Sequence, residues 1–323
     1  MTDLPVGRRV VVRHRTPDGA ATDVLGVLVA ADHERLVIRP DRTPGDADVT
    51  VARPDVIAAK PVPARARRAS DVDALERIMA EHWRSPDTAR LGGDRGWLLR
   101  AAQGFTNRAN SALVTGDPGV PLREALDEVV GWYRSRGLGP RLAVPDWPSR
   151  RWDGVRDAGW TALPGAGAHV QVASVPDLLR RAGLGSADLP RVRWTAVPDD
   201  AWLAAYHYRG QDLPPIGLSL LCSAHDQGFG SVQGEDGDTI AVIRVSSGAG
   251  WAGITAVEVD PAHRRRGLGR GLVTAAADWA AQRSLDRCYL QVGTGNEPAL
   301  RLYLDAGFIE HHTYEYVVPP TPR

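Results

Sequence analysis

The sequence is poor in cysteine and holds no cluster of metal-binding side chains. Of its 323 residues only two are cysteines, Cys222 and Cys288, and they lie far apart in apolar surroundings. There is no Cys-x-x-Cys pair and no histidine cluster at ligand spacing. The sequence therefore predicts neither a structural disulfide nor a metal site.

An excess of charge and a long apolar run are also missing. The 39 basic and 39 acidic residues give a formal net charge of zero at pH 7. A dedicated DNA- or RNA-binding protein would carry a strongly basic face, so nucleic acid is not expected as a partner. No run of about 18 apolar residues occurs, and residues 1–12 lack the apolar core of a signal peptide. We therefore expect a cytoplasmic protein without a membrane partner.

The composition, 43% hydrophobic and 24% charged, is that of a globular protein, and the length suits two or three packed units. Residues 1–60 contain short β-branched runs separated by turn-forming residues. These runs are Val10–Val12, Val24–Ala30, Leu36–Ile38 and Val49–Val51. About five short strands predict a small all-β, SH3-like barrel. The Pro-, Ala- and Arg-rich residues 61–69 are typical of a linker.

The remaining residues alternate between helix and strand patterns, which predicts an α/β (α+β) fold with mixed sheets flanked by helices. A helix is expected to begin at Ser70, where Ser70 and Asp73 have the spacing of a capping box. A second helix is expected over residues 122–136 and ends at Gly137. We place the boundary between a first half, 70–188, and a second half, 189–323.

The two halves share an internal spacing that favours a tandem duplication. In the first half a strand ends at Val144, and Gly159 of an Asp-Ala-Gly-Trp motif follows fifteen positions later. In the second half a strand ends at Val292, and Gly307 of an Asp-Ala-Gly-Phe motif follows at the same distance. The sequence therefore predicts two copies of one supersecondary unit.

A loop in the second copy has the composition of an anion-binding site. The predicted strand Ile254–Val259 leads into a loop with three consecutive arginines and then into a helix. The helix is expected to bury an apolar stripe of Leu268, Leu272, Val273, Ala276 and Trp279. Free N–H groups and the positive end of a helix bind phosphate, and Gly267 and Gly269 allow the backbone to approach it closely. Arg264 to Arg266 and Arg270 add charge that suits a pyrophosphate.

These residues make the second half similar to the GNAT superfamily of N-acetyltransferases. Its pyrophosphate signature is matched by Arg264-x-x-Gly267-x-Gly269 after the strand end Val259-Asp260-Pro261. A later signature is matched by Asn296 and by Leu302-Tyr303 followed by Gly307-Phe308. The whole chain resembles actinobacterial GNAT proteins that have an SH3-like N-terminal domain and a degenerate half before a catalytic half.

The resemblance implies acetyl-CoA as the cosubstrate, with no metal. It implies that the backbone of Val257 and Val259 pairs with the pantetheine arm, that Asn296 bonds this arm, and that Tyr303 protonates the departing thiolate. It also implies that two strands, ending near Val259 and Val292, splay apart around the thioester. The residues implied to hold the pyrophosphate are Arg264, Arg265, Arg266, Gly267, Leu268, Gly269 and Arg270.

The acceptor amine arrives protonated, so a base is needed, and Glu258 on the first of these strands is our candidate. Its alternative role is that of a surface carboxylate on an alternating strand. Some relatives that acetylate peptide N-termini carry Glu at the position of Gln291. Glutamine cannot act as a base, which argues against a ribosomal-protein acetyltransferase.

The first half departs from the signature. Its corresponding loop, residues 115–121, lacks arginine, and Tyr303 and Asn296 correspond to Val155 and Pro148. We expect this half to have the fold without the catalytic groups. Several polar clusters are candidates for the acceptor pocket or for ordinary turns and caps. They are residues 97–100, residues 104–111, Glu81 with His82 and Trp83, and His207 with Tyr208 and Asp212.

The sequence therefore predicts an N-acetyltransferase that moves acetyl from acetyl-CoA to a primary amine by direct attack. The acceptor is a small-molecule or a peptide amine, and the pattern does not choose between them. One alternative is a catalytically weak CoA-binding scaffold or sensor that acts through the SH3-like domain, whose partner is unknown. A nucleic-acid role of this domain is a third reading, which its balanced charge does not support.

Overall fold

The structure is a computed structural model that describes residues 4, 6, 8–40, 48–62, 68–145, 150–183, 190–207 and 213–320. The chain divides into two compact units, Met1–Arg67 and Arg68–Arg323. No helix in the described ranges is long and apolar enough to cross a membrane.

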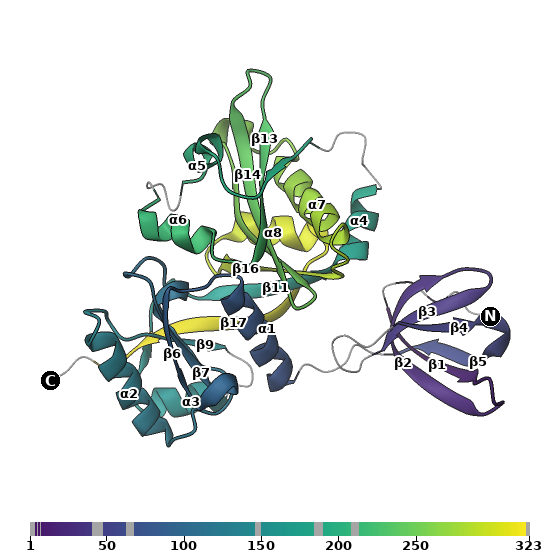
Figure 1. Ribbon diagram of the computed structural model, residues 1–323, viewed down its shortest axis with the longest axis horizontal. Helices are drawn as coiled ribbons and strands as arrows, with labels where there is room; N and C mark the ends of the chain where they lie inside the picture. The colour runs from purple at the N-terminus through teal and green to yellow at the C-terminus, as the bar shows by residue number, and fades with distance from the viewer. Residues whose placement is uncertain are drawn as a thin grey trace. The chain divides into compact units, whose positions relative to one another are not determined.

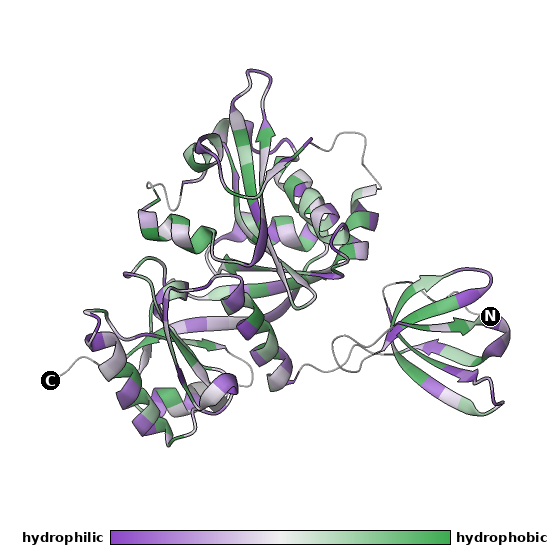
Figure 2. Ribbon diagram, in the orientation of Figure 1, coloured by the Kyte–Doolittle hydropathy of each residue, from purple (hydrophilic) through white to green (hydrophobic). Residues whose placement is uncertain are grey.

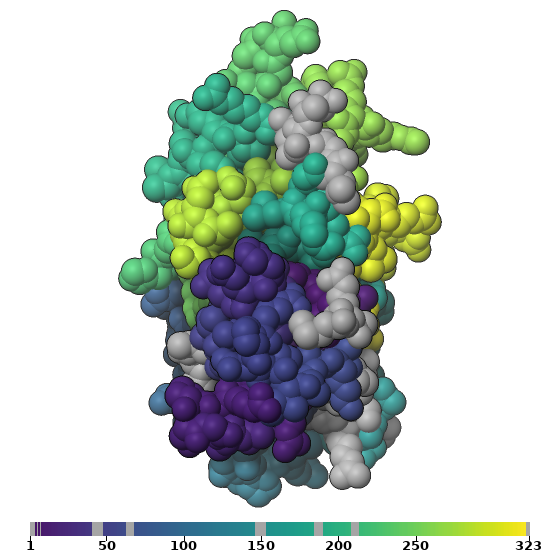
Figure 3. All heavy atoms as spheres, turned by 90° about the vertical axis from the view of Figure 1, so that its right-hand side faces the viewer, coloured from purple at the N-terminus to yellow at the C-terminus, as the bar shows by residue number. Residues whose placement is uncertain are grey.

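The N-terminal unit is a five-stranded antiparallel sheet in the order β4-β3-β2-β1-β5 (Figure 1). Its atoms are the purple and dark blue ones in the space-filling view of Figure 3. Its side chains alternate along the strands, so that Val10, Leu28 and Ile38 are fully buried in a small core. The predicted small all-β domain is confirmed. The strands are β1 (Arg9–Arg15), β2 (Ala21–Ala31), β3 (Arg35–Pro40), β4 (Val49–Ala52) and β5 (Val56–Pro61).

The described strands of the second unit form a single mixed sheet. Its order is β12-β13-β14-β15-β16-β11-β17-β9-β8-β7-β6, with the short β10 paired to β17. Strands from the first half are β6 (Asp87–Leu91), β7 (Trp97–Ala101), β8 (Ala112–Leu113), β9 (Leu142–Pro145), β10 (Thr161–Ala162) and β11 (Ala168–Ser174). Strands from the second half are β12 (Arg193–Thr195), β13 (Asp226–Gln233), β14 (Thr239–Gly248), β15 (Trp251–Val259), β16 (Arg287–Gly293) and β17 (Ile309–Val318).

The second unit repeats one order of elements. In the first half, β7, β8, α2 (Leu122–Arg134), β9, α3 (Arg150–Asp157) and β11 follow one another, and β8 is parallel to β9. In the second half, β14, β15, α7 (Leu268–Ala281), β16, α8 (Glu297–Ala306) and β17 do the same, and β15 is parallel to β16. The predicted tandem arrangement of two mixed-sheet halves is confirmed.

The two halves exchange their last strands. Strand β11, from the first half, pairs with β16 on one side and with β17 on the other. Strand β17, from the second half, continues to β9 in the first half, as the yellow strand in Figure 1 shows. Because each half completes the other half's sheet, we expect them to fold as one cooperative body.

Helices cover both faces of this sheet. Helices α4 (Val175–Gly183), α7 and α8 pack on one face of the second half, and α5 (Asp200–Ala205) and α6 (Pro215–Leu221) pack on the other. In the first half, α2 and α3 lie on one face and α1 (Ala69–Glu81) on the other. The apolar stripe predicted for α7 is confirmed, since Leu272, Val273, Ala276 and Trp279 are buried (Figure 2).

The expected start of α1 is wrong in detail. The helix begins at Ala69, and its cap is formed by Arg68, whose backbone N–H donates to the Asp71 carboxylate at 2.9 Å. The predicted pairing of Ser70 with Asp73 therefore does not form the capping box. Asp73 instead accepts a hydrogen bond from the backbone N–H of Gly116, on a distant loop.

Candidate active site

Strands β15 and β16 pair for only part of their length and then separate. Their parallel pairing runs from Trp251 with Arg287 to Ile254 with Leu290. Beyond this point β15 remains paired with β14 on its other side, up to Val259 with Ala241. The edge of β15 from Thr255 to Val259 is therefore free of a strand partner among the described residues, and the predicted splay is confirmed.

A β-bulge lies at the start of this free edge. Val242 pairs with Glu258 and Arg244 with Thr255, so Ile243 alone lies opposite both Ala256 and Val257. Ala256 has a φ of +51°, which a residue with a side chain adopts at a cost of roughly 1–2 kcal/mol. Bulges are enriched next to active sites because they turn backbone groups out of the ladder. No glycine occurs at this position, so nothing in the sequence indicates the bulge.

The loop after β15 presents positive charge at the start of α7. Arg264 donates from Nε to the carbonyl of Val259 at 3.0 Å, and Gly267 enters the helix with a φ of +81°. Arg264, Arg265 and Arg266 are exposed, and none is ion-paired within the described part of the chain. Uncompensated guanidinium groups beside the first N–H groups of a helix suit an anion such as a pyrophosphate.

Helix α8 carries the other signature residues. Asn296 caps this helix, because its side-chain oxygen accepts from the backbone N–H of Ala299 at 3.2 Å. Its amide nitrogen makes no hydrogen bond to any described residue and remains available as a donor. Tyr303 is 8% exposed, and burial raises the pKa of its hydroxyl to about 12. The phenol therefore stays protonated at neutral pH.

The structure brings most of the predicted site residues together. Val257, Val259, Leu268 and Tyr303 belong to one hydrophobic cluster on the α7 and α8 side of the sheet. Gly269 lies against α8, where a Cβ atom would meet Leu302 at 3.0 Å. The close approach of α7 and α8 therefore depends on a small residue at this position.

Glu258 lies on a different side of β15 from this cluster. Its carboxylate accepts a hydrogen bond from the backbone N–H of His207 at 3.2 Å. The side chain of His207 is exposed, while Tyr208 and Asp212 lie outside the described residues. Glu258 and Tyr303, the candidate base and the candidate acid, thus lie on different sides of the strand.

The corresponding loop of the first half binds a carboxylate that belongs to helix α1. The carboxylate of Asp73, which is 6% exposed, accepts from the N–H of Gly116 at 3.0 Å. Val155, at the position of Tyr303, is 1% exposed and carries no proton to donate. Pro148, at the position of Asn296, lies outside the described residues. The geometry of this loop therefore agrees with the expectation of a degenerate half.

The junction of the halves holds a buried polar network that sequence reasoning did not identify as one site. His82 accepts or donates through Nδ1 to the Tyr289 hydroxyl at 2.8 Å, and Arg244 donates to the carbonyl of His82 at 3.0 Å. Burial and the nearby Arg244 lower the pKa of His82 to about 4. The one available signal was Arg244 itself, an arginine within the apolar run of β14.

The polar segment from Gly104 to Ser111 is a hydrogen-bonded turn. The side-chain oxygen of Asn110 accepts from the N–H groups of Ala102 and Gly104, at 2.8 and 2.9 Å. Its amide donates to the carbonyl of Phe105 at 2.7 Å. Asn110 therefore holds this segment as a turn, while Arg108 of the same segment lines a cavity.

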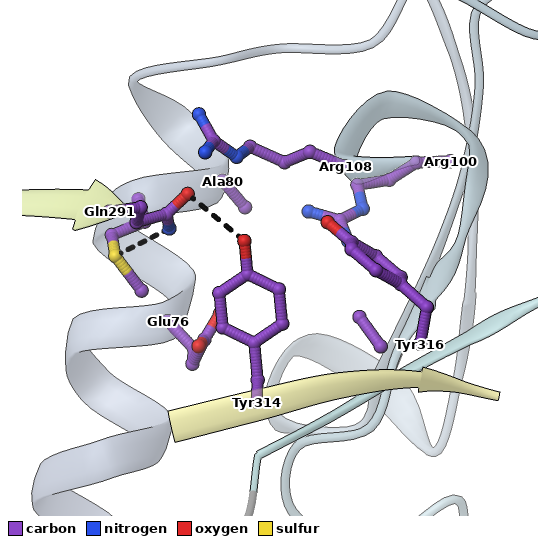
Figure 4. Close-up of a pocket in the computed structure, with 9 residues that line it drawn as sticks. Glu76, Ala80, Arg100, Arg108, Gln291, Tyr314 and Tyr316 are labelled. Atoms are coloured by element: carbon purple, nitrogen blue, oxygen red, sulfur yellow. Dashed lines mark hydrogen bonds between the residues drawn. The ribbon is translucent and has the colours of Figure 1, made fainter. Parts of the chain in front are cut away.

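A narrow polar cavity lies on the α1 side of the sheet, between the halves (Figure 4). It has about 250 Å³ of empty space but accommodates only about one water molecule. Gln291, the first residue of β16 beyond its pairing with β15, points into this cavity. The other lining residues are Glu76, Met79, Ala80, Arg100, Arg108, Ala143, Tyr314 and Tyr316.

No group of three or more His, Cys, Asp or Glu side chains in the described ranges has the geometry of a metal site. The candidate chemistry therefore consists of a free strand edge, a cationic loop, a carboxylate and a protonated phenol. This set suits acyl transfer from a phosphate-bearing thioester.

Comparisons with known sequences agree over nearly the whole chain. A family described as the C-terminal part of the probable histone acetyltransferase Rv0428c matches residues 69–317, and its N-terminal Sm-like domain matches residues 4–60. The Mycobacterium tuberculosis protein of that name is 32% identical over 321 residues, 97% of this chain and 95% of its own length. A mycothiol acetyltransferase of Clavibacter michiganensis subsp. michiganensis is 30% identical over 254 residues, 68% of this chain and 79% of its own.

Solved structures share the fold. A GCN5-related N-acetyltransferase from Kribbella flavida aligns with a TM-score of 0.56 and 18% identity, covering 80% of this chain and 98% of that one. A tandem GNAT protein from the clavulanic acid biosynthesis pathway aligns with a TM-score of 0.56 and 15% identity, covering 79% of this chain and 91% of that one.

Proposed function

Because this chain belongs to the family of the probable histone acetyltransferase Rv0428c, and is a GNAT-type acyltransferase, we propose that it transfers acetyl from acetyl-CoA to a primary amine. The observation that carries this proposal is the free edge of β15 beyond Ile254, which leads directly into the arginine-rich loop before α7. An extended pantetheine arm pairs with such an edge while its pyrophosphate binds at the loop.

Each predicted site residue has a role in this proposal. The backbone of Val257 and Val259 pairs with the pantetheine amides, and pantetheine displaces the Nε of Arg264 from the Val259 carbonyl. The pyrophosphate binds to the segment from Arg264 to Arg270, and Asn296 donates from its free amide. The names of two relatives refer to acceptors as different as a histone and streptothricin. Neither name therefore defines the class of amine that this chain acetylates.

The chemical step needs one base and one acid. Glu258 accepts the proton of the acceptor ammonium, directly or through a water, and the neutral amine attacks the thioester carbonyl. The bond from carbon to sulfur then breaks while the Tyr303 hydroxyl donates a hydrogen bond to the departing thiolate, and the remaining extra proton of the attacking nitrogen goes to this thiolate, which leaves as the thiol. Because the pKa of Tyr303 is raised, the phenol acts chiefly as a hydrogen-bond donor while the charge develops.

The test is a thiol-release assay with acetyl-CoA and a panel of primary amines. Gly267→Glu places a carboxylate at the phosphate position and should abolish transfer. Gly267→Ala has the same strained positive φ without the charge, and it should retain most of the activity. Amine-dependent thiol release that is equal in wild type and Gly267→Glu would contradict the proposed donor site.

Glu258→Gln tests the base separately. The variant should lower kcat by roughly 10²–10⁴-fold near pH 7, and the deficit should shrink at pH values where the amine is already deprotonated. An unchanged rate at pH 7 would show that another group accepts the proton.

A further inference from the structure

The buried centre between the halves contains more positive than negative charge. Arg100 and Arg244 are 3% and 0% exposed, and Arg108 has a buried Nε without a hydrogen-bond partner. Burying a charge is costly unless a counter-charge lies beside it. Within the described part of the chain, none of these three guanidinium groups is ion-paired with a carboxylate.

Neutral groups satisfy two of these arginines. Arg100 donates to the carbonyl and the hydroxyl of Ser111, at 3.1 and 3.0 Å. Arg244 donates to the carbonyls of Leu221 and His82 and to the side chains of Thr255 and Gln227. Burial lowers the pKa of both arginines, that of Arg244 to about 10. Their charge is therefore hydrogen-bonded but not neutralised.

Arg108 has only neutral partners, although burial, which lowers the pKa of its guanidinium, is outweighed by the adjacent Tyr314 and Tyr316 hydroxyls, which raise it. Its guanidinium lies 5.8 Å from the ring centre of Trp83, and Arg244 lies 5.5 Å from the same ring. The Tyr314 hydroxyl is beside Arg108, and both side chains line the cavity (Figure 4). A ring face and a phenol hydroxyl together supply less compensation than a carboxylate does.

The one carboxylate of the cavity is already engaged. Glu76 accepts from Nε2 of His312 at 2.8 Å, and these side chains are 7% and 1% exposed. Among the described residues, the cavity is thus lined by two guanidinium groups, of Arg100 and Arg108, and by one carboxylate that is bonded to a histidine. The Tyr314 hydroxyl already donates to Oε1 of Gln291 at 3.4 Å, so the donors left for a ligand are the guanidinium groups, which bind carboxylates.

The cavity also lies next to the splay. Gln291 forms part of its wall and is the first residue of β16 beyond the last pairing with β15. Only the end of a ligand fits the space, so the body of that ligand has to lie outside it. A group bound near Arg108 is therefore attached to one of the two reactants that meet at the splay.

We propose that this cavity binds a carboxylate carried by a reactant of the transfer, with Arg108 as the residue that selects it. This inference rests on the proposed function and names the substrate class for the same site. The carboxylate belongs either to the acceptor, as in an amino acid, or to the acyl chain of the donor, as in a dicarboxylic acyl-CoA. Arg108 acts as a specificity residue, and the missing counter-charge comes from the ligand.

The first test measures binding without catalysis. Thermal unfolding of the full chain is recorded with succinate and with succinamide as probes. Succinate should raise the wild-type midpoint by about 2–4 °C at saturating concentration, and succinamide should not. Arg108→Gln should abolish the shift, Arg108→Lys should keep part of it, and Arg123→Gln, on the exposed face of α2, should keep all of it.

The same variants separate selection from a structural role. If Arg108 only supported the fold, Arg108→Gln would lower the midpoint without any ligand. Removing an uncompensated buried charge should instead leave this midpoint unchanged or raise it.

The second test separates the two sources of the carboxylate. In the acceptor arm, acetyl-CoA is combined with matched pairs such as alanine with alaninamide and 4-aminobutyrate with 4-aminobutanamide. In the donor arm, succinyl-CoA is compared with acetyl-CoA for one fixed amine. A preference of about 10- to 100-fold in kcat/KM for the carboxylate in one arm, lost in Arg108→Gln, identifies the source.

Failure of this inference is distinguishable from failure of the proposed function. If acetyl transfer occurs but carboxylates and carboxamides react equally in both arms, and succinate gives no shift, the inference is overturned and the function stands. If no amine is acetylated but succinate shifts the midpoint through Arg108, the carboxylate site stands and the acetyltransferase proposal fails.

Discussion

The two loops that enter α2 and α7 occupy equivalent places in the repeat but differ in charge. Each follows the first strand of a parallel pair and spans eight residues, 114–121 in the first half and 260–267 in the second. The first loop contains no arginine, and its Gly116 binds the carboxylate of Asp73. The second has three exposed arginines, and its one carboxylate, that of Asp260, accepts from the backbone N–H of Ala262 at 2.8 Å before the arginines begin. The same backbone arrangement thus occurs with a loop that is occupied by a carboxylate of the protein and with a loop whose arginines are exposed. The ability to bind a phosphate depends on these side chains and not on the fold.

The helices that follow show the same contrast. Tyr303 on α8 and Val155 on α3 are both buried, at 8% and 1% exposure, so each helps to pack its half. Only Tyr303 also offers a hydroxyl, whose raised pKa keeps it protonated. Packing alone does not require that hydroxyl, which makes it the sharpest difference between the two copies.

Removing this hydroxyl should have the largest effect. Tyr303→Phe should lower kcat by roughly 10²–10⁴-fold, because the leaving thiolate loses its donor, while the Kd for acetyl-CoA changes little. Steady-state kinetics and calorimetry on the same preparation check both values. Val155→Ala serves as the matched change in the other half, and it should reduce stability without a specific loss of kcat. If Tyr303→Phe retained the full kcat, Tyr303 would not be the donor to the departing thiolate.

Much of this comparison could be predicted from the sequence. The fifteen-residue spacing to Gly159 and Gly307 is local and predicted the repeat, and the apolar stripe predicted α7. Because residues 115–121 contain no arginine, the sequence predicted that this loop binds no phosphate. These features depend on residues close together in the chain, where periodicity and turn chemistry act directly.

The long-range features could not be predicted. No local pattern identifies which strands lie beside residues 168–174 and 309–318, so the exchange of β11 and β17 could not be predicted. The residue with a positive φ in the bulge is Ala256 and not a glycine, so the sequence does not indicate the bulge. The junction of His82, Arg244 and Tyr289 joins three segments that are far apart in the sequence, and only the folded chain brings them together.

The junction of the two halves predicts how the stability of the protein depends on pH. His82, from the first half, is neutral in the fold because its pKa is lowered to about 4 from the usual 6.5. The unfolded chain therefore binds a proton first as the pH falls. The free energy of unfolding should therefore fall by about 3 kcal/mol as the pH is lowered from about 6.5 to about 4, and it should not depend on His82 above this range.

Urea unfolding at a series of pH values measures this change, and His82→Gln is the variant that removes the titrating group. The slope of the unfolding free energy against pH should be shallower in His82→Gln across this window. Equal slopes in both proteins would show that His82 is not the group responsible.

The smallest expected effect concerns the internal anion of the first loop. Asp73→Asn should lower the free energy of unfolding by roughly 1–3 kcal/mol, because a charged acceptor of the Gly116 N–H is lost at a buried position. It should leave acetyl-CoA binding unchanged, since the loop still lacks arginine. Urea unfolding and calorimetry test the two statements. A gain of a second acetyl-CoA site in this variant would show that Asp73 alone closes the first half.

Calorimetric titration of the full chain with acetyl-CoA tests whether only the second half binds this cosubstrate. The wild type should bind one acetyl-CoA per chain. Gly267→Glu should bind none, and Pro121→Glu, the matched change before α2, should bind one with unchanged affinity. Two sites in the wild type, or one site that survives Gly267→Glu and disappears in Pro121→Glu, would contradict the assignment of the two halves.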